Sequence, residues 1–385
     1  MIHWHFTGMV LEPDSVYDQN GAYSGSSVVY EEKLHLFYTG NVKEEGNHDY
    51  ILSGRQANVL SVSTVDGHHM SPKSILLKNS DYPKDCSCHV RDPKVWLEDG
   101  VWHMVLGART RESQGCVLYY ESADLKTWTY KKRLTVQDFG YMWECPDEFV
   151  IDDRRYLSIS PQGLSHKEYC HQNVYSSGYF MVEEQLTDFE EWDYGFDFYA
   201  PQTFESDDGR RILYGWMGLP DCPYENPTVE LGWQHCLTLP RVVTANASGH
   251  LLQNPVEEIN QLRYDKWEVC AGETVNVSLP FDLTADTDGP FCICLNQDIC
   301  MNYENGIFTL EFKNEKIGRG RSVRRVKLEI CRKLRIIADY SSMEIYLDGG
   351  RKVLSTRFYP EKKEVTLDTN IARTILYKMK PMSVE

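Results

Sequence analysis

Four copies of one short segment recur along the chain, and this repeat constrains the fold more than any other feature of the sequence. Each copy opens on a small or polar group, often beside a proline, and continues through an apolar segment, an acidic turn and a second apolar segment. The copies are Ser24–Gly40, Arg91–Ala108, Glu144–Ser160 and Tyr199–Trp216. Their starts are separated by 67, 53 and 55 residues, a period that suits one four-stranded propeller blade rather than a helical repeat. Equivalent positions of successive blades converge on the propeller axis, so we predict that Asp92 and Glu144 face one shared pocket.

The rest of the chain is also dominated by short apolar or alternating segments punctuated by Asp-Gly turns, which is typical of β-strands. The one helix we predict runs from Pro255 to Arg263 and begins where the repeat stops. Beyond it the strands are closely spaced, as in an antiparallel sandwich. We therefore predict an all-β chain with a β-propeller over residues 1–254, a linker helix over 255–266 and a C-terminal β-sandwich over 267–385.

Composition narrows the classes of partner. The chain has 40 Lys and Arg against 57 Asp and Glu, a net charge of −17, which argues against nucleic acid and anionic membranes. A basic cluster between Lys316 and Lys327 is therefore interpreted as a solvated loop and edge strand. The start of the sequence, Met1 to His5, has neither the basic nor the apolar part of a signal peptide. We accordingly expect a cytoplasmic protein whose 12 cysteines are mostly free thiols. Formation of a homo-oligomer stays open.

Several short motifs occur together in the order found in glycoside hydrolase family 32, and the chain resembles this family over essentially its whole length. The motifs are Tyr23-Ser24-Gly25-Ser26, Arg91-Asp92-Pro93, Trp143-Glu144-Cys145-Pro146-Asp147, Tyr199-Ala200-Pro201-Gln202 and Gly215-Trp216-Met217-Gly218. The resemblance implies a five-bladed β-propeller followed by a β-sandwich. It also implies retaining cleavage of a β-fructofuranosidic bond in sucrose, sucrose 6-phosphate or a fructo-oligosaccharide, with no cofactor and no metal.

The resemblance also implies roles for single residues. Glu144 matches the family's general acid/base, and Asp92 matches the carboxylate that stabilises the transition state by holding fructose hydroxyls. Retaining glycosidases place the carboxylate nucleophile and the carboxylic acid that protonates the leaving oxygen about 5 to 5.5 Å apart. Sugar-binding roles are implied for Tyr23, Ser24, Arg91 and Trp216. Taken alone, Asp92 is better explained by a turn before Pro93 and Glu144 by a charge at a strand edge, and only the repeat positions and the order of the motifs reverse this. Trp216 is equally well explained by core packing.

One part of the family pattern is absent from this sequence. The family's nucleophile is the Asp of a Trp-Met-Asn-Asp-Pro-Asn-Gly motif in the first blade, and no such stretch occurs here. Asp14 and Asp18 do not replace it, because they precede Tyr23 on a loop and lack the motif's neighbours. We therefore expect that the first blade is largely missing. Two functions remain: a fructosidase of low or no activity, and a truncated or non-catalytic protein that binds fructosides.

Overall fold

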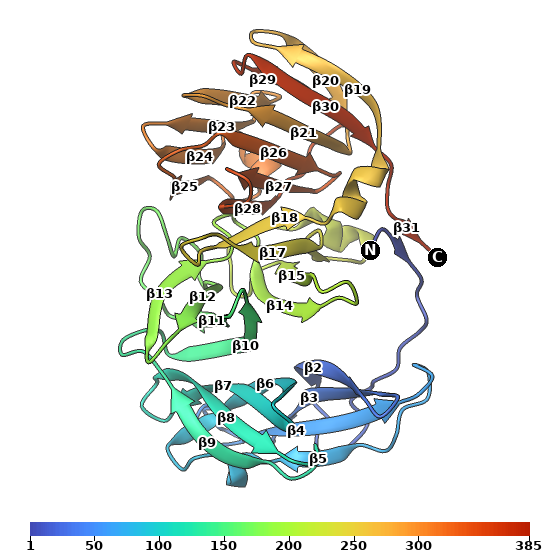
Figure 1. The fold of residues 1–385 in the computed structure, drawn as a ribbon, viewed down its shortest axis with the longest axis vertical. Helices are drawn as coiled ribbons and strands as arrows, with labels where there is room; N and C mark the ends of the chain where they lie inside the picture. The colour runs from blue at the N-terminus through green and yellow to red at the C-terminus, as the bar shows by residue number, and fades with distance from the viewer. The chain divides into compact units, whose positions relative to one another are not determined.

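The computed structural model describes residues 1–385, and nearly all of its regular structure is β-sheet (Figure 1). The chain divides into two compact units, which we call the N-terminal unit and the C-terminal unit. The N-terminal unit comprises Phe6–Leu164 and Gly178–Glu190; the C-terminal unit comprises Met1–His5, Ser165–Ser177 and Glu191–Glu385. None of the helices has the length and apolar character needed to span a membrane.

The N-terminal unit contains three antiparallel sheets of four strands each, and in every sheet the strand order follows the chain order. The first sheet is β2 (Ala22–Tyr30), β3 (Lys33–Lys43), β4 (Arg55–Thr64) and β5 (Ser74–Leu77). The second is β6 (Cys86–Glu98), β7 (Val101–Thr110), β8 (Gly115–Ser122) and β9 (Thr129–Leu134). The third is β10 (Met142–Ile151), β11 (Arg154–Gln162), β12 (Gly178–Val182) and β13 (Leu186–Glu191). Such a four-stranded meander is the form of one propeller blade.

The second sheet is buried on both faces. Successive side chains of a strand point to opposite sides, and in β7 the neighbours Met104 and Val105 are both fully buried. Met104 joins a cluster with Phe37 of the first sheet, whereas Val105 joins a cluster with Trp143 of the third sheet. Burying each such side chain stabilises the fold by about 1.5 to 3 kcal/mol. The three sheets therefore pack face to face, each of the three repeats supplying one layer.

The C-terminal unit contains the sheet of the fourth repeat and two larger sheets. The fourth sheet is β14 (Tyr199–Glu205), β15 (Arg211–Met217), β17 (Arg241–Ala245) and β18 (Leu251–Pro255), with the short β16 (Cys236–Leu237) paired to β15. One six-stranded sheet has the order β19 (Arg263–Cys270), β30 (Arg373–Met379), β21 (Phe281–Asp286), β26 (Lys333–Ala338), β27 (Ser342–Leu347) and β28 (Lys352–Arg357). The other has the order β20 (Thr274–Ser278), β29 (Glu364–Thr369), β22 (Phe291–Leu295), β23 (Ile299–Glu304), β24 (Ile307–Phe312) and β25 (Val323–Lys327). The two-residue strands β1 (His3–Trp4) and β31 (Ser383–Val384) pair with each other.

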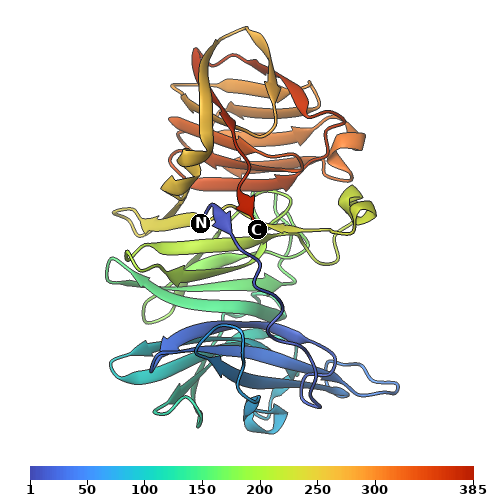
Figure 2. The ribbon, with the colours of Figure 1, turned by 90° about the vertical axis from the view of Figure 1, so that its right-hand side faces the viewer.

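The two six-stranded sheets form a sandwich, stacked one on the other in Figure 2. Their shared core takes Leu283 and Ile336 from one sheet and Met301 and Phe308 from the other. All four side chains are at most 1% exposed. The predicted class, a β-propeller followed by a β-sandwich, is confirmed. The blade count of five stays a prediction.

The predicted linker helix is shorter than expected. A 3₁₀-helix, η3 (Glu257–Leu262), stands in its place, with Ile259 and Leu262 buried as the sequence pattern indicated. Strand β18 extends to Pro255 and β19 begins at Arg263, so only seven residues separate the two strands, and short connectors of this kind often contain 3₁₀ turns. The fourth sheet also groups with the sandwich in one compact unit. The predicted division at residues 254 and 267 stays a proposal.

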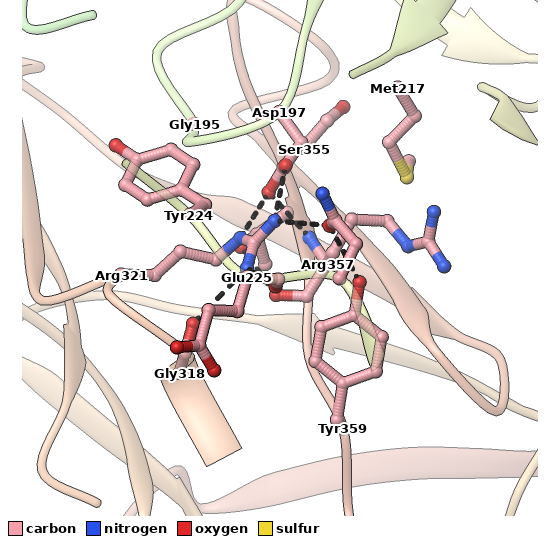
Figure 3. A network of polar contacts seen from close by, with 12 residues as sticks. Gly195, Asp197, Met217, Tyr224, Glu225, Gly318, Arg321, Ser355, Arg357 and Tyr359 are labelled. Atoms are coloured by element: carbon pink, nitrogen blue, oxygen red, sulfur yellow. Dashed lines mark hydrogen bonds and ion pairs between the residues drawn. The ribbon is translucent and has the colours of Figure 1, made fainter. Parts of the chain in front are cut away.

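The interpretation of the basic cluster as fully solvated is wrong for two of its members. Arg321 is 1% exposed and Arg324 is 7% exposed. Figure 3 shows Arg321 directed at Asp197, whose carboxylate accepts hydrogen bonds of 2.7 Å from its Nε and Nη2 atoms. Asp197 also accepts the backbone N–H of Arg357 at 2.8 Å. An acidic partner 124 residues away in sequence thus lets an arginine of this cluster be buried.

The cysteines are mostly free thiols. Ten of them are unpaired, and Cys294 and Cys300 form a disulfide. These two residues face each other on the neighbouring strands β22 and β23. The disulfide therefore links strands that are already hydrogen-bonded within the sandwich.

Candidate active site

The first strand of each repeat carries an irregularity at the same place. The pairing register of that strand shifts within a few residues of its start, which is the mark of a β-bulge. The shifts lie between Tyr23 and Gly25, Arg91 and Lys94, Glu144 and Asp147, and Tyr199 and Gln202. The same β-bulge therefore occurs in four sheets, and in each it changes the direction of the side chains at equivalent positions.

Three of these bulges contain a strained residue before a proline. Asp92, Cys145 and Ala200 have φ angles of 64°, 46° and 49°. A residue before proline ordinarily adopts an extended conformation, and a non-glycine residue with positive φ costs about 1 to 3 kcal/mol. The bulges equate Arg91 with Glu144, and Asp92 with Cys145. The two predicted carboxylates therefore come from adjacent positions of the repeat, not from the same position.

Arg91 and Gln162 hold both oxygens of the Glu144 carboxylate. Oε1 of Glu144 accepts hydrogen bonds from Nε of Arg91 at 3.1 Å and from Nη2 at 2.5 Å. Oε2 accepts a hydrogen bond from Nε2 of Gln162 at 2.7 Å. Gln162 reaches it because β11 pairs with β10 and places Gln162 opposite Met142. Glu144 is thus oriented by one cation and one amide, and Gln162 carries no motif that the sequence analysis could have recognised.

Asp92 lies beside Glu144 in a nearly closed environment. It is 6% exposed, and its Oδ2 accepts the backbone N–H of Cys145 at 2.9 Å. The same oxygen lies 3.9 Å from Nε of Arg91. Burial, with a smaller contribution from the charge of Glu144, outweighs the attraction of Arg91 and raises the pKa of Asp92 to about 6. One guanidinium therefore contacts both predicted carboxylates.

His89 supports Arg91 from the other side. Its Nδ1 lies 2.9 Å from Nη1 of Arg91, and its Nε2 lies 3.0 Å from the carbonyl oxygen of Tyr50. Burial and the charges of neighbouring arginines, Arg91 first among them, lower the pKa of His89 to about 3. The ring is therefore neutral at physiological pH. It accepts from Arg91 through Nδ1 and donates through Nε2 to Tyr50.

Tyr23 and Ser24 connect to Asp92 through Thr39. The Thr39 hydroxyl donates to the carbonyl oxygen of Ser24 at 3.4 Å and accepts the backbone N–H of Asp92 at 2.9 Å. Ser24 also hydrogen-bonds the thiol of Cys145. The Tyr23 ring is 37% exposed and lies 5.7 Å from the guanidinium carbon of Arg55. Tyr23 pairs with Thr39 across β2 and β3. Five of the predicted site residues and their neighbours thus form one connected cluster in the N-terminal unit.

Trp216 belongs to the C-terminal unit. It lies in β15, is half-buried, and meets the ring of His235 edge to face at 4.8 Å between centroids. This contact gives Trp216 a packing partner of its own. Its assignment to a sugar site stays a prediction.

Asp18 is occupied by other contacts and is fully buried. Its carboxylate accepts hydrogen bonds from Lys73 at 2.6 Å, from the Tyr38 hydroxyl at 2.8 Å and from the backbone N–H of Ser15 at 2.9 Å. These bonds outweigh burial and lower the pKa of Asp18. Asp14 is exposed and pairs with the same lysine. Both contacts support the expectation that neither residue serves as a nucleophile.

Comparison with known proteins gives matches over almost the whole chain. The model described as "Glycosyl hydrolases family 32 N-terminal domain" matches residues 1–255, and "Glycosyl hydrolases family 32 C terminal" matches residues 256–374. A sucrose-6-phosphate hydrolase of Bacillus subtilis is 35% identical over 387 residues, covering 94% of this chain and 78% of the relative. A sucrose-6-phosphate hydrolase of Klebsiella pneumoniae is 37% identical with the same coverage.

Solved structures give the same picture. The structure of sucrose-6-phosphate hydrolase from Lactobacillus gasseri superimposes with a TM-score of 0.86 at 27% identity, covering 99% of this chain and 83% of that one. A mutant β-fructofuranosidase of Bombyx mori in complex with sucrose has a TM-score of 0.84 at 26% identity, covering 100% of this chain and 83% of that one. The fold of both units is therefore shared with glycosidases of known structure.

Proposed function

The chain belongs to glycosyl hydrolase family 32, and from that premise we propose that it acts on the β-fructofuranosidic bond of sucrose or sucrose 6-phosphate. Its class is that of a β-fructofuranosidase, as in the sucrose-6-phosphate hydrolases to which it is similar. The observation that carries the proposal is the contact of one guanidinium, Arg91, with both Glu144 at 2.5 Å and Asp92 at 3.9 Å. These two carboxylates correspond to the general acid/base and the transition-state stabiliser, whereas the nucleophile of retaining cleavage would be a third carboxylate.

The two carboxylates take different roles. Glu144 protonates the departing glycosidic oxygen and then deprotonates the attacking water. Arg91 and Gln162 fix its orientation, so that the proton is delivered from one direction. Asp92 accepts hydrogen bonds from fructose hydroxyls, and these bonds strengthen as the ring flattens and gains positive charge. Tyr23 and Ser24 supply further contacts to the sugar.

We propose in addition that this chain by itself hydrolyses its substrate slowly. Arg91 contacts no third carboxylate in the described chain, and Asp18 is committed to Lys73 and Tyr38. Without a carboxylate that attacks the anomeric carbon, the covalent intermediate of a retaining mechanism does not form. By analogy with removing a catalytic nucleophile elsewhere, the loss reaches about 10⁶ in kcat. The absence of a third carboxylate beside Arg91 also favours the second candidate function, which is binding of fructosides without turnover.

The test is the release of glucose or glucose 6-phosphate by the purified chain, with and without an added segment that carries the Trp-Met-Asn-Asp-Pro-Asn-Gly motif. We expect trace activity alone and a rise on addition of the segment, abolished by Glu144→Gln. Full activity of the chain alone, still abolished by Glu144→Gln, would support the site and refute the missing nucleophile. Activity that is indifferent to Glu144→Gln and Asp92→Ala would refute the proposed function.

A further inference from the structure

Three cysteines lie together on one sheet of the sandwich, on the neighbouring strands β22 and β23 (Figure 1). Successive side chains of a strand point to opposite faces, and Ile293 and Leu295 of β22 lie in the sandwich core. Cys292 and Cys294 therefore point away from that core. Cys300 of β23 pairs with Cys294 and forms a disulfide with it. The free thiol of Cys292 lies 3.7 Å from Sγ of Cys294, so a thiol stands in contact with a disulfide.

The three cysteines differ in their exposure to solvent. Cys294 is 8% exposed and Cys300 is 1% exposed, whereas Cys292 is half-buried. Exchange between a thiol and a disulfide requires that the attacking thiolate reach a sulfur atom. The buried disulfide is therefore shielded from thiols in solution, and Cys292 is the sulfur of this group that they reach most readily.

Strand geometry allows the disulfide to move from Cys300 to Cys292. Residues joined by a disulfide have Cα atoms about 4.4 to 6.8 Å apart. Two strand steps of about 3.3 Å place the Cα atoms of Cys292 and Cys294 about 6.6 Å apart, which is within that range. Cys292 pairs with Asn302, so Cys300 is its diagonal neighbour, at about 7 to 8 Å and beyond the range. Cys294 can therefore bond either of the other two cysteines, and those two cannot bond each other.

The two strands are held together without the disulfide. It joins residues only 6 positions apart in the sequence, and so short a loop constrains the unfolded chain less than a long one does. Backbone pairing of β22 with β23 runs over Phe291–Leu295 and Ile299–Tyr303. The disulfide can accordingly be broken and re-formed while the sandwich stays folded.

We propose that Cys292 is a thiol-exchange site, through which small thiols of the glutathione class reduce and re-form the buried Cys294–Cys300 disulfide. The Cys292 thiolate attacks Sγ of Cys294, and Cys300 leaves as a thiolate that takes up the proton lost by Cys292. A small thiol, after losing its proton, attacks Sγ of Cys292, forms a mixed disulfide and releases Cys294, which takes up that proton.

A second small thiol completes the reduction. It attacks the sulfur of the first small thiol and releases Cys292, which takes up the second proton. In sum, two small thiols are oxidised to their disulfide, and the protein disulfide is reduced to the thiols of Cys294 and Cys300. The reverse sequence re-forms the protein disulfide. The inference is independent of the proposed function, because no sugar takes part.

The experiment follows the reduction of the disulfide by glutathione in the full chain. Burial raises the pKa of Cys292, Lys313 lowers it and Asp368 raises it further, so the reaction is run at about pH 8.5, where more of the attacking thiolate is present. Samples are quenched with iodoacetamide, and mass spectrometry of peptides reads the state of each cysteine.

The parent chain is compared with Cys292→Ser and with the control Cys222→Ser. Cys222 is also a half-buried free thiol, and it lies between β15 and η2 (Pro227–Leu231) rather than on β22. The control therefore removes one thiol of the same kind without touching the disulfide. Melting temperatures establish that each variant is folded.

We expect the disulfide of Cys292→Ser to be reduced at least about tenfold more slowly than that of the parent, and the disulfide of Cys222→Ser at the rate of the parent. A second variant, Cys300→Ala, removes the cross-strand partner and tests the other bond directly. When it is oxidised with glutathione disulfide, it should form a disulfide between Cys292 and Cys294, detected as a peptide in which neither cysteine reacts with iodoacetamide.

Equal rates of reduction in the parent and Cys292→Ser would overturn the inference, because the disulfide would then be attacked without the help of Cys292. Equally slow reduction in both serine variants would also overturn it, since the effect would not be specific to Cys292. The same holds if the parent, purified without reductant, has free thiols at Cys294 and Cys300. A Cys300→Ala variant that keeps glutathione on Cys294, with no bond to Cys292, would contradict the proposed transfer.

Discussion

Replacing Asp92 with Asn should stabilise the protein at neutral and alkaline pH, because Asp92 is a carboxylate buried at a cost to the fold. Burial raises its pKa from 3.8 to about 6. This difference corresponds to about 3 kcal/mol between the ionised and protonated forms in the folded state. Asn has nearly the same shape, and its Oδ1 can still accept the backbone N–H of Cys145. The variant therefore loses the buried charge and keeps the hydrogen bond.

The sign of the pH dependence follows from the direction of the shift. The folded pKa lies above the unfolded value, so the proton binds the folded state more tightly. At pH values below 3.8 Asp92 is protonated in both the folded and the unfolded state, so its titration does not change the free energy of unfolding. As pH rises towards about 6, ionisation in the unfolded state pulls the equilibrium towards unfolding, and above that the full cost is present. The gain from Asp92→Asn should be about 1 kcal/mol near pH 4.5 and about 3 kcal/mol near pH 8.

The assay is thermal unfolding followed by circular dichroism at both pH values. For a unit of this size each kcal/mol corresponds to about 2 to 4 °C, so we expect Tm to rise by about 6 to 12 °C near pH 8. The control is Asp153→Asn, which removes one exposed carboxylate from the turn between β10 and β11 and should change Tm little. If the Tm of Asp92→Asn near pH 8 is equal to or below that of the parent, the claim that the buried, ionised Asp92 carboxylate destabilises the fold is refuted.

Two further substitutions remove buried charges that stabilise the fold, in contrast to the charge of Asp92. Arg241 is fully buried between Asp193 and Glu344, with ion pairs of 3.2 and 2.6 Å, so Arg241→Met should cost about 3 to 5 kcal/mol in the free energy of urea unfolding; an unchanged urea midpoint would contradict this. The pKa of Asp18 is lower in the folded state than its ordinary value of 3.8. The ionised carboxylate therefore stabilises the fold at pH values above 3.8, and this stabilisation is lost as the pH falls through the lower pKa of the folded state. Asp18→Asn should therefore lower Tm near neutral pH and leave it unchanged in strong acid, without changing fructoside affinity; a loss of affinity with an unchanged Tm would place Asp18 in the site.

The fold class could be predicted because it depends on patterns that are local in sequence. Alternation within strands, turns between them and the spacing of the repeats indicated the propeller sheets and the sandwich. The proximity of Asp92 and Glu144 also followed, since repeat-equivalent segments converge. The offset of one position between them could not be predicted, because it depends on bulges at Asp92 and Cys145, whose positive φ angles leave no mark in the composition.

Residues that act through distant partners could not be identified from the sequence. Gln162 reaches Glu144 across the β10–β11 pairing, and Thr39 reaches Asp92 from another sheet; neither lies in a motif. The charge of Arg321 indicated a solvated surface, yet Asp197, far away in the chain, allows its burial. In each case the decisive quantity is the position of a partner after folding, which a charge or polarity pattern does not contain.

The most direct measurement is a crystal structure of the Glu144→Gln variant soaked with sucrose 6-phosphate. We expect hydroxyls of the fructosyl ring within hydrogen-bond distance of the Asp92 carboxylate, and the glycosidic oxygen beside the side-chain amide at position 144. Arg91 should keep its contacts to both positions. A sugar bound elsewhere, with the Asp92 carboxylate still held by Arg91 and Cys145 and in contact with no sugar hydroxyl, would contradict the assignment of these two carboxylates to one fructoside site.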